Sequence, residues 1–263
     1  KRQAREVMRN IRWKIAVASG KGGVGKSFVT ANLAAAWAMK GYKVSVLDHD
    51  FDGPCIPKLL GMTGKRLTLS EKGIVPATGP LGITVVSMGL IMGGDEVLTW
   101  FHDMRRSATE EFLAHVDWGQ RDILLVDLPP GTSSDAVNLL QYIPDLAGVV
   151  VVTVPTDVSQ GVARKTILLA AKAGTRIFGV VENMSGYVCP KCGEVSYVFL
   201  KGGGERIAEE LGVPFLGAIP LDQKISEASD RGVPFVYAYP ETPGAKVFFS
   251  IRDKIEEMIE KGE

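Results

Sequence analysis

The chain has 263 residues, which is enough for one large α/β domain or for two small ones. Its 30 lysine and arginine residues balance 30 aspartate and glutamate residues, so net charge points neither to nucleic acid nor to an acidic surface as a partner. No apolar run approaches the roughly 18 residues of a membrane span, and no apolar signal-peptide core follows the basic first residues. Three cysteines do not make a secreted disulfide framework. We therefore expect a cytoplasmic protein with no membrane or nucleic-acid partner.

The first predicted element is a helix with a basic, solvent-facing side. Six basic residues stand close together at the start of the chain: Lys1, Arg2, Arg5, Arg9, Arg12 and Lys14. A nucleic-acid-binding arm usually carries more charge than this, so a solvated helical face explains the cluster better.

Beyond this arm, short apolar runs alternate with longer helical patterns. The predicted strands are Ile15–Ser19, Lys43–Asp48, Ile83–Met88, Ile123–Asp127, Val149–Val154, Arg176–Glu182 and Phe215–Ile219. Each is nearly continuous in apolar residues, which is typical of strands buried on both faces of a parallel sheet. The predicted helices are Lys26–Met39, Thr109–Val116, Asp135–Tyr142, Gln160–Lys172, Gly204–Leu211, Ile225–Asp230 and Pro243–Lys261. The alternation predicts an α/β fold with a doubly wound, mostly parallel sheet flanked by helices.

Two segments interrupt this alternation. Thr63–Pro80 is rich in glycine, proline and threonine and predicts a hairpin or excursion at the edge of the sheet. Ser185–Gly204 contains a cysteine pair and several glycines, and long irregular insertions of this kind are more often functional than idle. Because no linker divides the chain, we expect residues 1–263 to form one domain with an insertion at about 185–204.

A phosphate-binding loop is the clearest functional motif. Gly20-Lys21-Gly22-Gly23-Val24-Gly25-Lys26-Ser27 matches G-x-x-x-x-G-K-[ST] between a predicted strand and a predicted helix. Glycines let backbone N–H groups approach phosphates, and the helix N-terminus adds partial positive charge. We expect Lys26 to reach the β- and γ-phosphates and Ser27 to bind Mg²⁺. The motif predicts an ATPase whose nucleotide-binding residues run from Gly20 to Phe28.

A second lysine in this loop narrows the class. Lys21 stands where the deviant motif K-G-G-x-G-K-[ST] of the MinD, ParA and nitrogenase-iron-protein group has its own early lysine, so the loop resembles that group. The resemblance implies a homodimer in which this lysine crosses to the partner's nucleotide. A cation supplied in this way would stabilise charge on the transferring phosphoryl group, as an arginine finger does.

Carboxylates follow two of the predicted strands. The apolar strand Ile123–Asp127 ends in an acid, so Asp127 should support Mg²⁺ directly or through water, and the turn Leu128–Thr132 is suited to sensing a γ-phosphate. Asp48 and Asp50 lie two apart after another strand, so an extended segment would aim both the same way. We assign Asp50 to positioning the attacking water and Asp48 to the outer shell of the metal, although the two roles could be exchanged. His49 is interpreted as a bystander.

The cysteine pair predicts a shared metal site. Cys189 and Cys192 sit in the insertion as Cys-Pro-Lys-Cys-Gly. Two thiolates cannot complete a tetrahedral metal site or a four-iron cluster, both of which normally take four ligands. If the pair binds metal, a second chain should provide the remaining ligands, in agreement with the dimer implied by Lys21.

The sequence as a whole resembles the Mrp/ApbC family of P-loop ATPases, which carry or scaffold iron–sulfur clusters. Beside the loop and cysteine motifs, the matching segments are Asp48-x-Asp50-x-x-Gly53-Pro54, Val126–Thr132, Glu182–Ser185, Gly202-Gly203-Gly204 and Pro214–Asp222. The resemblance implies a homodimer that bridges a four-iron four-sulfur cluster through both copies of the cysteine pair and delivers it to apo iron–sulfur proteins. It also implies adenine contacts from Asn183, Pro220, Leu221 and Asp222, which favours ATP as the nucleotide.

The chain departs from the family pattern at two places. Cys55 stands where serine is usual, and we interpret it as a small, partly buried residue and not as a third ligand. Trp100-Phe101-His102-Asp103-Met104 replaces a more usual Trp-Arg-Gly-Pro-Met run, so we expect the target that this loop recognises to differ.

Two other functions remain open from the sequence. One is a positioning ATPase of the MinD or ParA kind, which would act as a switch on a membrane or on DNA. Its support is the apolar stripe of the last predicted helix, although such a stripe more often packs in a core. Alternatively, the same dimer could hold zinc as a structural clasp, because thiolate ligands suit zinc and iron–sulfur clusters alike.

Overall fold

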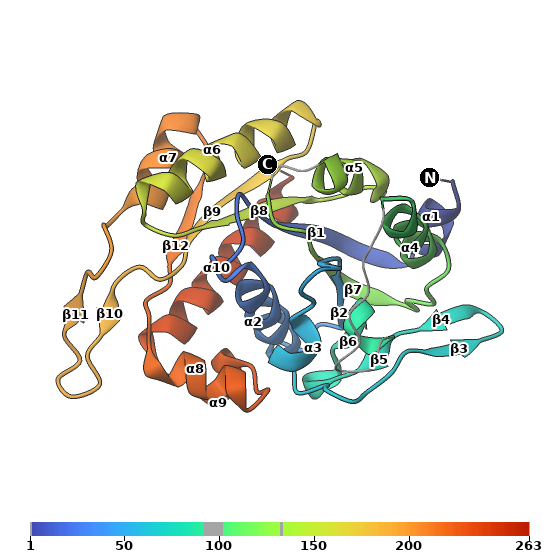
Figure 1. Cartoon of the computed structure of the whole chain (residues 1–263), viewed down its shortest axis with the longest axis horizontal. Helices are drawn as coiled ribbons and strands as arrows, with labels where there is room; N and C mark the ends of the chain where they lie inside the picture. Colours follow the sequence, from blue (N-terminus) through green and yellow to red (C-terminus); the bar gives the residue numbers. More distant parts are fainter. Residues whose placement is uncertain (1, 92–101, 132–133, 263) are drawn as a thin grey trace.

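An eight-stranded sheet forms the centre of the molecule (Figure 1). The computed structural model describes residues 2–91, 102–131 and 134–262. In spatial order the strands are β12 (Phe215–Ala218), β9 (Ile177–Glu182), β8 (Gly148–Thr153), β1 (Ile11–Ser19), β7 (Arg121–Asp127), β2 (Val44–Asp48), β6 (Thr84–Ser87) and β5 (Ala77–Thr78). All neighbours pair in parallel except β5, which runs antiparallel to β6. The predicted doubly wound sheet is confirmed, and β1 lies where the strand order reverses.

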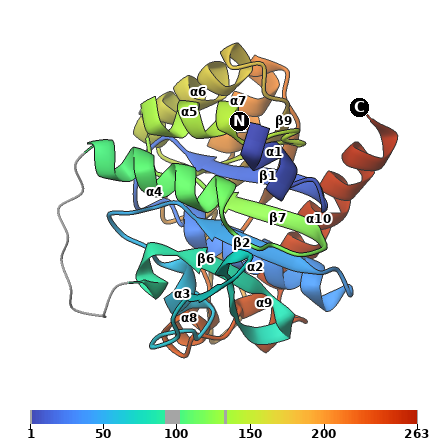
Figure 2. The same ribbon diagram turned by 90° about the vertical axis from the view of Figure 1, so that its right-hand side faces the viewer.

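Helices cover both faces of this sheet (Figures 1 and 2). One face carries α2 (Lys26–Met39), α3 (Ile56–Leu59), α8 (Gln223–Asp230), α9 (Phe235–Ala238) and α10 (Pro243–Lys261). The other carries α1 (Arg2–Val7), α4 (His102–Ala114), α5 (Ser134–Tyr142), α6 (Asp157–Lys172) and α7 (Gly203–Leu211). Short 3-10 turns, η1 (Pro80–Gly82) and η2 (Met88–Leu90), flank β6.

The central strand packs on both helical layers. Side chains of β1 alternate, so that Ile15 and Val17 join the core beneath α2 and α10, whereas Ala16 and Ala18 join the core beneath α4 and α5. This double burial explains why the strands are apolar throughout. The stripe of α10 also lies in the core, with Phe248 fully buried. Within the described residues, no helix is long and apolar enough to cross a membrane.

Two small hairpins stand outside the sheet. β3 (Thr68–Ser70) and β4 (Gly73–Val75) precede the edge strand β5, as the composition of this segment predicts. β10 (Tyr187–Val188) and β11 (Val195–Ser196) form an antiparallel pair that projects from the sheet below α7 in Figure 1. The insertion is therefore more regular than its composition suggests.

The start of the chain differs from its prediction. Helix α1 ends at Val7 and β1 begins at Ile11, so Arg12 and Lys14 lie in a strand and not on a helical face. Lys14 is 4% exposed, and burial lowers the pKa of its ammonium group, whose Nζ donates to the carbonyl of Ile11 at 3.3 Å. The prediction of a helix is wrong for these two residues, because the segment from Ile11 pairs with β7 as a strand although its charges resemble those of the helix before it.

Three helical segments were also misplaced or missed. Helix α4 begins at His102 and not at Thr109, and it ends at Ala114. The expected loop at Trp100–Met104 is therefore helical from His102 onward, while Trp100 and Phe101 lie outside the described residues. The single turns α3 and α9 were not predicted, because four residues carry too little periodic signal.

Candidate functional site

The phosphate-binding loop lies between β1 and α2, with its shape imposed by close packing. Gly25 has φ 83°, and a Cβ at this position would lie 2.2 Å from Asn183 Nδ2. That nitrogen donates to the carbonyl oxygen of Val24 at 3.0 Å. A Cβ on Gly20 would lie 2.6 Å from the backbone carbonyl carbon of Val162. Glycine is therefore required at both ends of the loop, and Asn183 lies directly against it.

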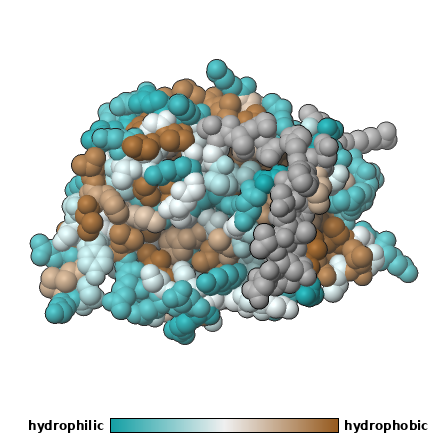
Figure 3. Space-filling model, in the orientation of Figure 1, coloured by the Kyte–Doolittle hydropathy of each residue, from teal (hydrophilic) through white to brown (hydrophobic). Residues whose placement is uncertain are grey.

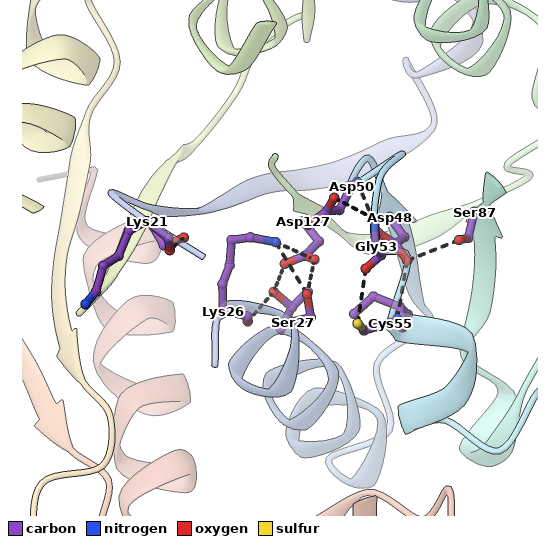
Figure 4. Close-up of polar contacts among 12 residues, drawn as sticks. Lys21, Lys26, Ser27, Asp48, Asp50, Gly53, Cys55, Ser87 and Asp127 are labelled. Carbon is purple, nitrogen blue, oxygen red and sulfur yellow. Dashed lines mark hydrogen bonds and ion pairs between the residues drawn. The ribbon is translucent and has the colours of Figure 1, made fainter. Parts of the chain in front are cut away.

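A buried ion pair joins this loop to the end of β7 (Figure 4). Lys26 Nζ lies 2.6 Å from Asp127 Oδ2, with the two side chains 5% and 0% exposed. The same carboxylate accepts the hydroxyl of Ser27 at 2.6 Å and that of Thr30 at 2.6 Å. The Asp127 carboxylate therefore binds three side chains from the first two turns of α2.

A second carboxylate, at the end of β2, is buried beside the first. Asp48 is fully buried and accepts the hydroxyl of Ser87 at 3.1 Å and the backbone N–H of Ile56 at 3.3 Å. Burial, and after it the charge of Asp127, raises the pKa of Asp48 to about 8, while Lys26 acts in the opposite direction. The ligand-free site thus favours a proton on Asp48, which a bound cation would displace.

Asp50 differs from its neighbour in exposure. It is half-buried, and its Oδ1 accepts the backbone N–H of Gly53 at 3.2 Å, whereas its own N–H donates to Asp48 Oδ1 at 3.2 Å. Both acids lie near Asp127 in Figure 4. Of the two, Asp50 has the carboxylate that solvent can reach.

The loop after β2 is held by one face of α4. His49 Nε2 lies 2.8 Å from Thr109 Oγ1, and Arg105 forms an ion pair with Asp52 at 2.5 Å. Because the Thr109 hydroxyl donates to the carbonyl of Arg105 at 2.7 Å, the imidazole must be the donor in the first contact. Burial lowers the pKa of His49 to about 4, so the ring is neutral. His49 thus has a structural partner that sequence analysis missed.

Aromatic packing completes this contact. The Phe51 and Phe112 rings lie 6.2 Å apart at 64°, and Phe51 also packs on His49 at 4.4 Å. Arg105, Thr109 and Phe112 recur at spacings of four and three, which places them on one face of a helix. That periodicity is a signal in the sequence that marks these three side chains as one helix face, although it does not identify the loop that they contact.

Two further predicted residues of the nucleotide site have additional roles. The ring of Phe28 packs on Phe248 at 5.6 Å, so its backbone N–H is the group left for a phosphate. Asp222 Oδ1 accepts the N–H of Lys224 at 2.9 Å and caps α8. The Lys21 side chain is half-buried and points away from Lys26 in Figure 4.

The cysteine pair lies in the turn between β10 and β11. Cys189 is half-buried and Cys192 is exposed. The N–H of Cys189 donates to Glu194 O and its carbonyl accepts from Gly193 N, both at 2.8 Å. Backbone N–H groups at Cys192 and then Lys191, followed by the Cys192 thiol, lower the pKa of Cys189, which favours the thiolate that metals bind.

In the part of the chain that the structure describes, the pair has no further metal ligand nearby. Among the described residues, no group of three or more histidine, cysteine or acidic side chains lies close enough to hold a metal. Cys55 lies instead in the loop between β2 and α3, where its Sγ donates to Gly53 O at 3.1 Å (Figure 4). It is exposed, so the expectation of partial burial is wrong.

Comparison with known proteins identifies relatives of this fold and these motifs. A family model described as ParA, NUBPL iron-transfer P-loop NTPase, matches residues 10–256. The iron-sulfur cluster carrier protein of Saccharolobus solfataricus is 47% identical over 97% of this chain and 87% of the relative. The cytosolic Fe-S cluster assembly factor NUBP2 of Bos taurus is 40% identical over 93% and 92%, respectively.

Solved structures show the same similarity. A nucleotide-binding protein of Archaeoglobus fulgidus in complex with ADP has a TM-score of 0.81 and 36% identity, covering 94% of this chain and 96% of that one. The septum site-determining protein MinD of Pyrococcus horikoshii with Mg-ADP has a TM-score of 0.70 and 25% identity, covering 94% and 97%. The predicted kinship with MinD-type P-loop proteins is confirmed.

Proposed function

The chain belongs to the family of NUBPL iron-transfer P-loop NTPases, and from this premise we propose that it is an ATP-dependent iron–sulfur cluster carrier. As a homodimer it would bridge one four-iron four-sulfur cluster and transfer it to cytoplasmic apo-proteins. Residues 1–263 would act as one ATPase domain with the β10–β11 hairpin as its metal-binding insertion. The observation that carries the proposal is the pair of free cysteines, half-buried Cys189 and exposed Cys192, on the hairpin of a P-loop protein.

The nucleotide site would bind ATP through the backbone N–H groups of residues 20–28. Lys26 forms a buried ion pair with Asp127, and this pair would give way to the β- and γ-phosphates. Asp50, with its solvent-accessible carboxylate, would position the attacking water. Lys21 would serve the partner's nucleotide, in keeping with its orientation away from Lys26 (Figure 4). Adenine would contact Asn183 and the turn Pro220–Asp222.

The acids of this site fit a magnesium ion. Hydroxyl and carboxylate oxygens are the ligands that Mg²⁺ prefers, and Ser27 Oγ already lies 2.6 Å from Asp127 Oδ2. Ser27 would hold the ion with Asp127 and, in its outer shell, Asp48. The ion would neutralise charge on the phosphates.

The cluster is cargo and would be held between two copies of the chain. A four-iron cluster takes four cysteine ligands, and each chain brings two in its hairpin. The lowered pKa of Cys189 supports thiolate ligation. A dimer that places two hairpins together would therefore supply the set that one copy lacks.

Anaerobic reconstitution with iron and sulfide tests the proposal. The wild type should gain a brown absorbance and four irons per two chains, and Cys189→Ala and Cys192→Ala should lose both. Cys55→Ala is the matched control and should keep both, because this third cysteine lies outside the hairpin, in the loop between β2 and α3. Retention of the colour in the two hairpin variants would refute the cluster site. Zinc bound in place of iron after anaerobic purification would instead favour a structural clasp.

A further inference from the structure

One buried carboxylate closes the base of the cysteine insertion. Glu182, the last residue of β9, is 1% exposed. Its Oε1 accepts the hydroxyl of Ser185 at 2.6 Å, and its Oε2 accepts the backbone N–H of Gly204 at 2.6 Å. Ser185 and Gly204 are the two ends of the insertion that carries the cysteines. One side chain therefore holds both arms of this segment.

A helix N-terminus and a glycine lie next to this carboxylate. Gly204 lies in the first turn of α7, whose N-terminal partial charge stabilises an anion. A Cβ on Gly204 would lie 3.0 Å from Glu182 Cβ, and one on Gly203 would lie 1.7 Å from Gln160 Nε2. The close approach of Glu182 accounts for Gly204 in the Gly202-Gly203-Gly204 motif, which neither the nucleotide site nor the cysteine pair explains, whereas Gly203 faces the side chain of Gln160.

The residue after Glu182 touches the phosphate-binding loop. Asn183 Nδ2 donates to Val24 O at 3.0 Å, so consecutive residues contact the nucleotide loop and the cysteine insertion. The connection is direct, because one peptide bond joins the two contacts.

Backbone hydrogen bonds reinforce it. Leu221 N donates to Gly186 O at 2.7 Å and Val188 N donates to Leu221 O at 3.0 Å, which pairs the start of the hairpin with the turn proposed to contact adenine. Ser185 N also donates to Ile219 O at 2.9 Å. The hairpin is thus anchored on the elements that surround the nucleotide.

We propose that Glu182 is a positioning residue that couples the nucleotide site to the cysteine pair. A nucleotide that shifts Asn183 would move the end of β9, and Glu182 would pass this movement to both arms of the insertion. The hydrogen bond of Asn183 to Val24, together with those of Glu182 to Ser185 and Gly204, links the nucleotide loop to the base of the insertion. The inference rests on the proposed function, since it takes the loop to bind ATP and the pair to bind the cargo.

Cysteine alkylation measures this coupling without any metal. The reduced, metal-free protein is treated with iodoacetamide, with and without Mg²⁺ and a non-hydrolysable ATP analogue, and mass spectrometry follows Cys189 and Cys192. In the wild type, the nucleotide should change their alkylation rates on the order of fivefold. Glu182→Ala should bring the ratio near one while nucleotide affinity is retained. Glu182→Gln should keep the ratio, because its amide can accept from Gly204 and donate to Ser185.

Two further variants complete the experiment. Glu205→Ala removes an exposed acid next to Gly204 and should behave as the wild type. Ser185→Ala, which removes one partner of the carboxylate, should lower the ratio and serves if Glu182→Ala does not fold.

Three results would overturn the proposal: a ratio of one in the wild type, an unchanged ratio in Ser185→Ala or Glu182→Ala, or equal loss in Glu182→Gln. Failure of the carrier function would show separately, as failure to bind a cluster in reconstitution.

Discussion

Replacing Asp127 with asparagine should destabilise the ligand-free protein by about 3 kcal/mol. The substitution keeps the shape of the side chain but leaves the Lys26 ammonium, 5% exposed and 2.6 Å away, without its counter-ion. Removing one partner of a buried ion pair costs about 3–5 kcal/mol. We expect the lower end, because the charge of Asp127 helps to raise the pKa of Asp48. Once that charge is gone, Asp48 ionises more readily and compensates Lys26 in part.

Urea unfolding of the ligand-free protein measures this effect. The double variant Lys26→Met with Asp127→Asn is the control, since it removes both charges and should recover most of the lost free energy of unfolding. If the free energy of unfolding of the single variant lay within about 1 kcal/mol of the wild-type value, the reasoning would be refuted, because the buried Lys26 charge would then cost nothing when left unpaired. A double variant as unstable as the single one would point to lost hydrogen bonds and not to charge.

Three further predictions concern the reaction. Because its pKa is raised to about 8, Asp48 holds a proton at pH 7, so binding of Mg²⁺ and nucleotide should release up to about one proton. Calorimetry in buffers of different ionisation enthalpy detects this release, and Asp48→Asn should abolish it. Thr109→Val removes the hydrogen-bond acceptor for His49 and loosens the loop that carries Asp50, so it should lower ATP turnover about tenfold at unchanged nucleotide affinity. Thr109→Ser keeps the hydroxyl and should not lower turnover; an equal loss in both variants would refute this role. Lys21→Gln should lower turnover at least about 100-fold in a steady-state assay while binding persists, and unaltered turnover would remove it from the reaction.

Local patterns in the sequence determined much of the fold. Helices α2 and α10 begin and end at the predicted residues because their signals are local. Thr242 caps α10, a proline follows at its start, and Gly262 ends it with φ 66°. The phosphate-binding loop was equally predictable, since its residue types and its place between strand and helix both lie in one short segment.

Strand order explains why the acids could also be predicted. Asp48 and Asp127 end β2 and β7, which pair in parallel and set these residues side by side. Acids at the carboxyl ends of parallel strands meet at one edge of a sheet whatever the details of the helices. Their different exposures and the raised pKa of Asp48 were not predictable, because burial depends on what packs over each strand end.

Only the tertiary structure brought distant segments into contact. The hydrogen bond between Asn183 and Val24 joins positions 159 apart in the chain, and that between His49 and Thr109 joins positions 60 apart. Periodicity and motifs report which face of an element is apolar, but they do not specify which helix face meets which loop. The clamp of Glu182 on both arms of the cysteine insertion likewise follows from the packing of α7 against β9, so the link between the two candidate sites became visible only in three dimensions.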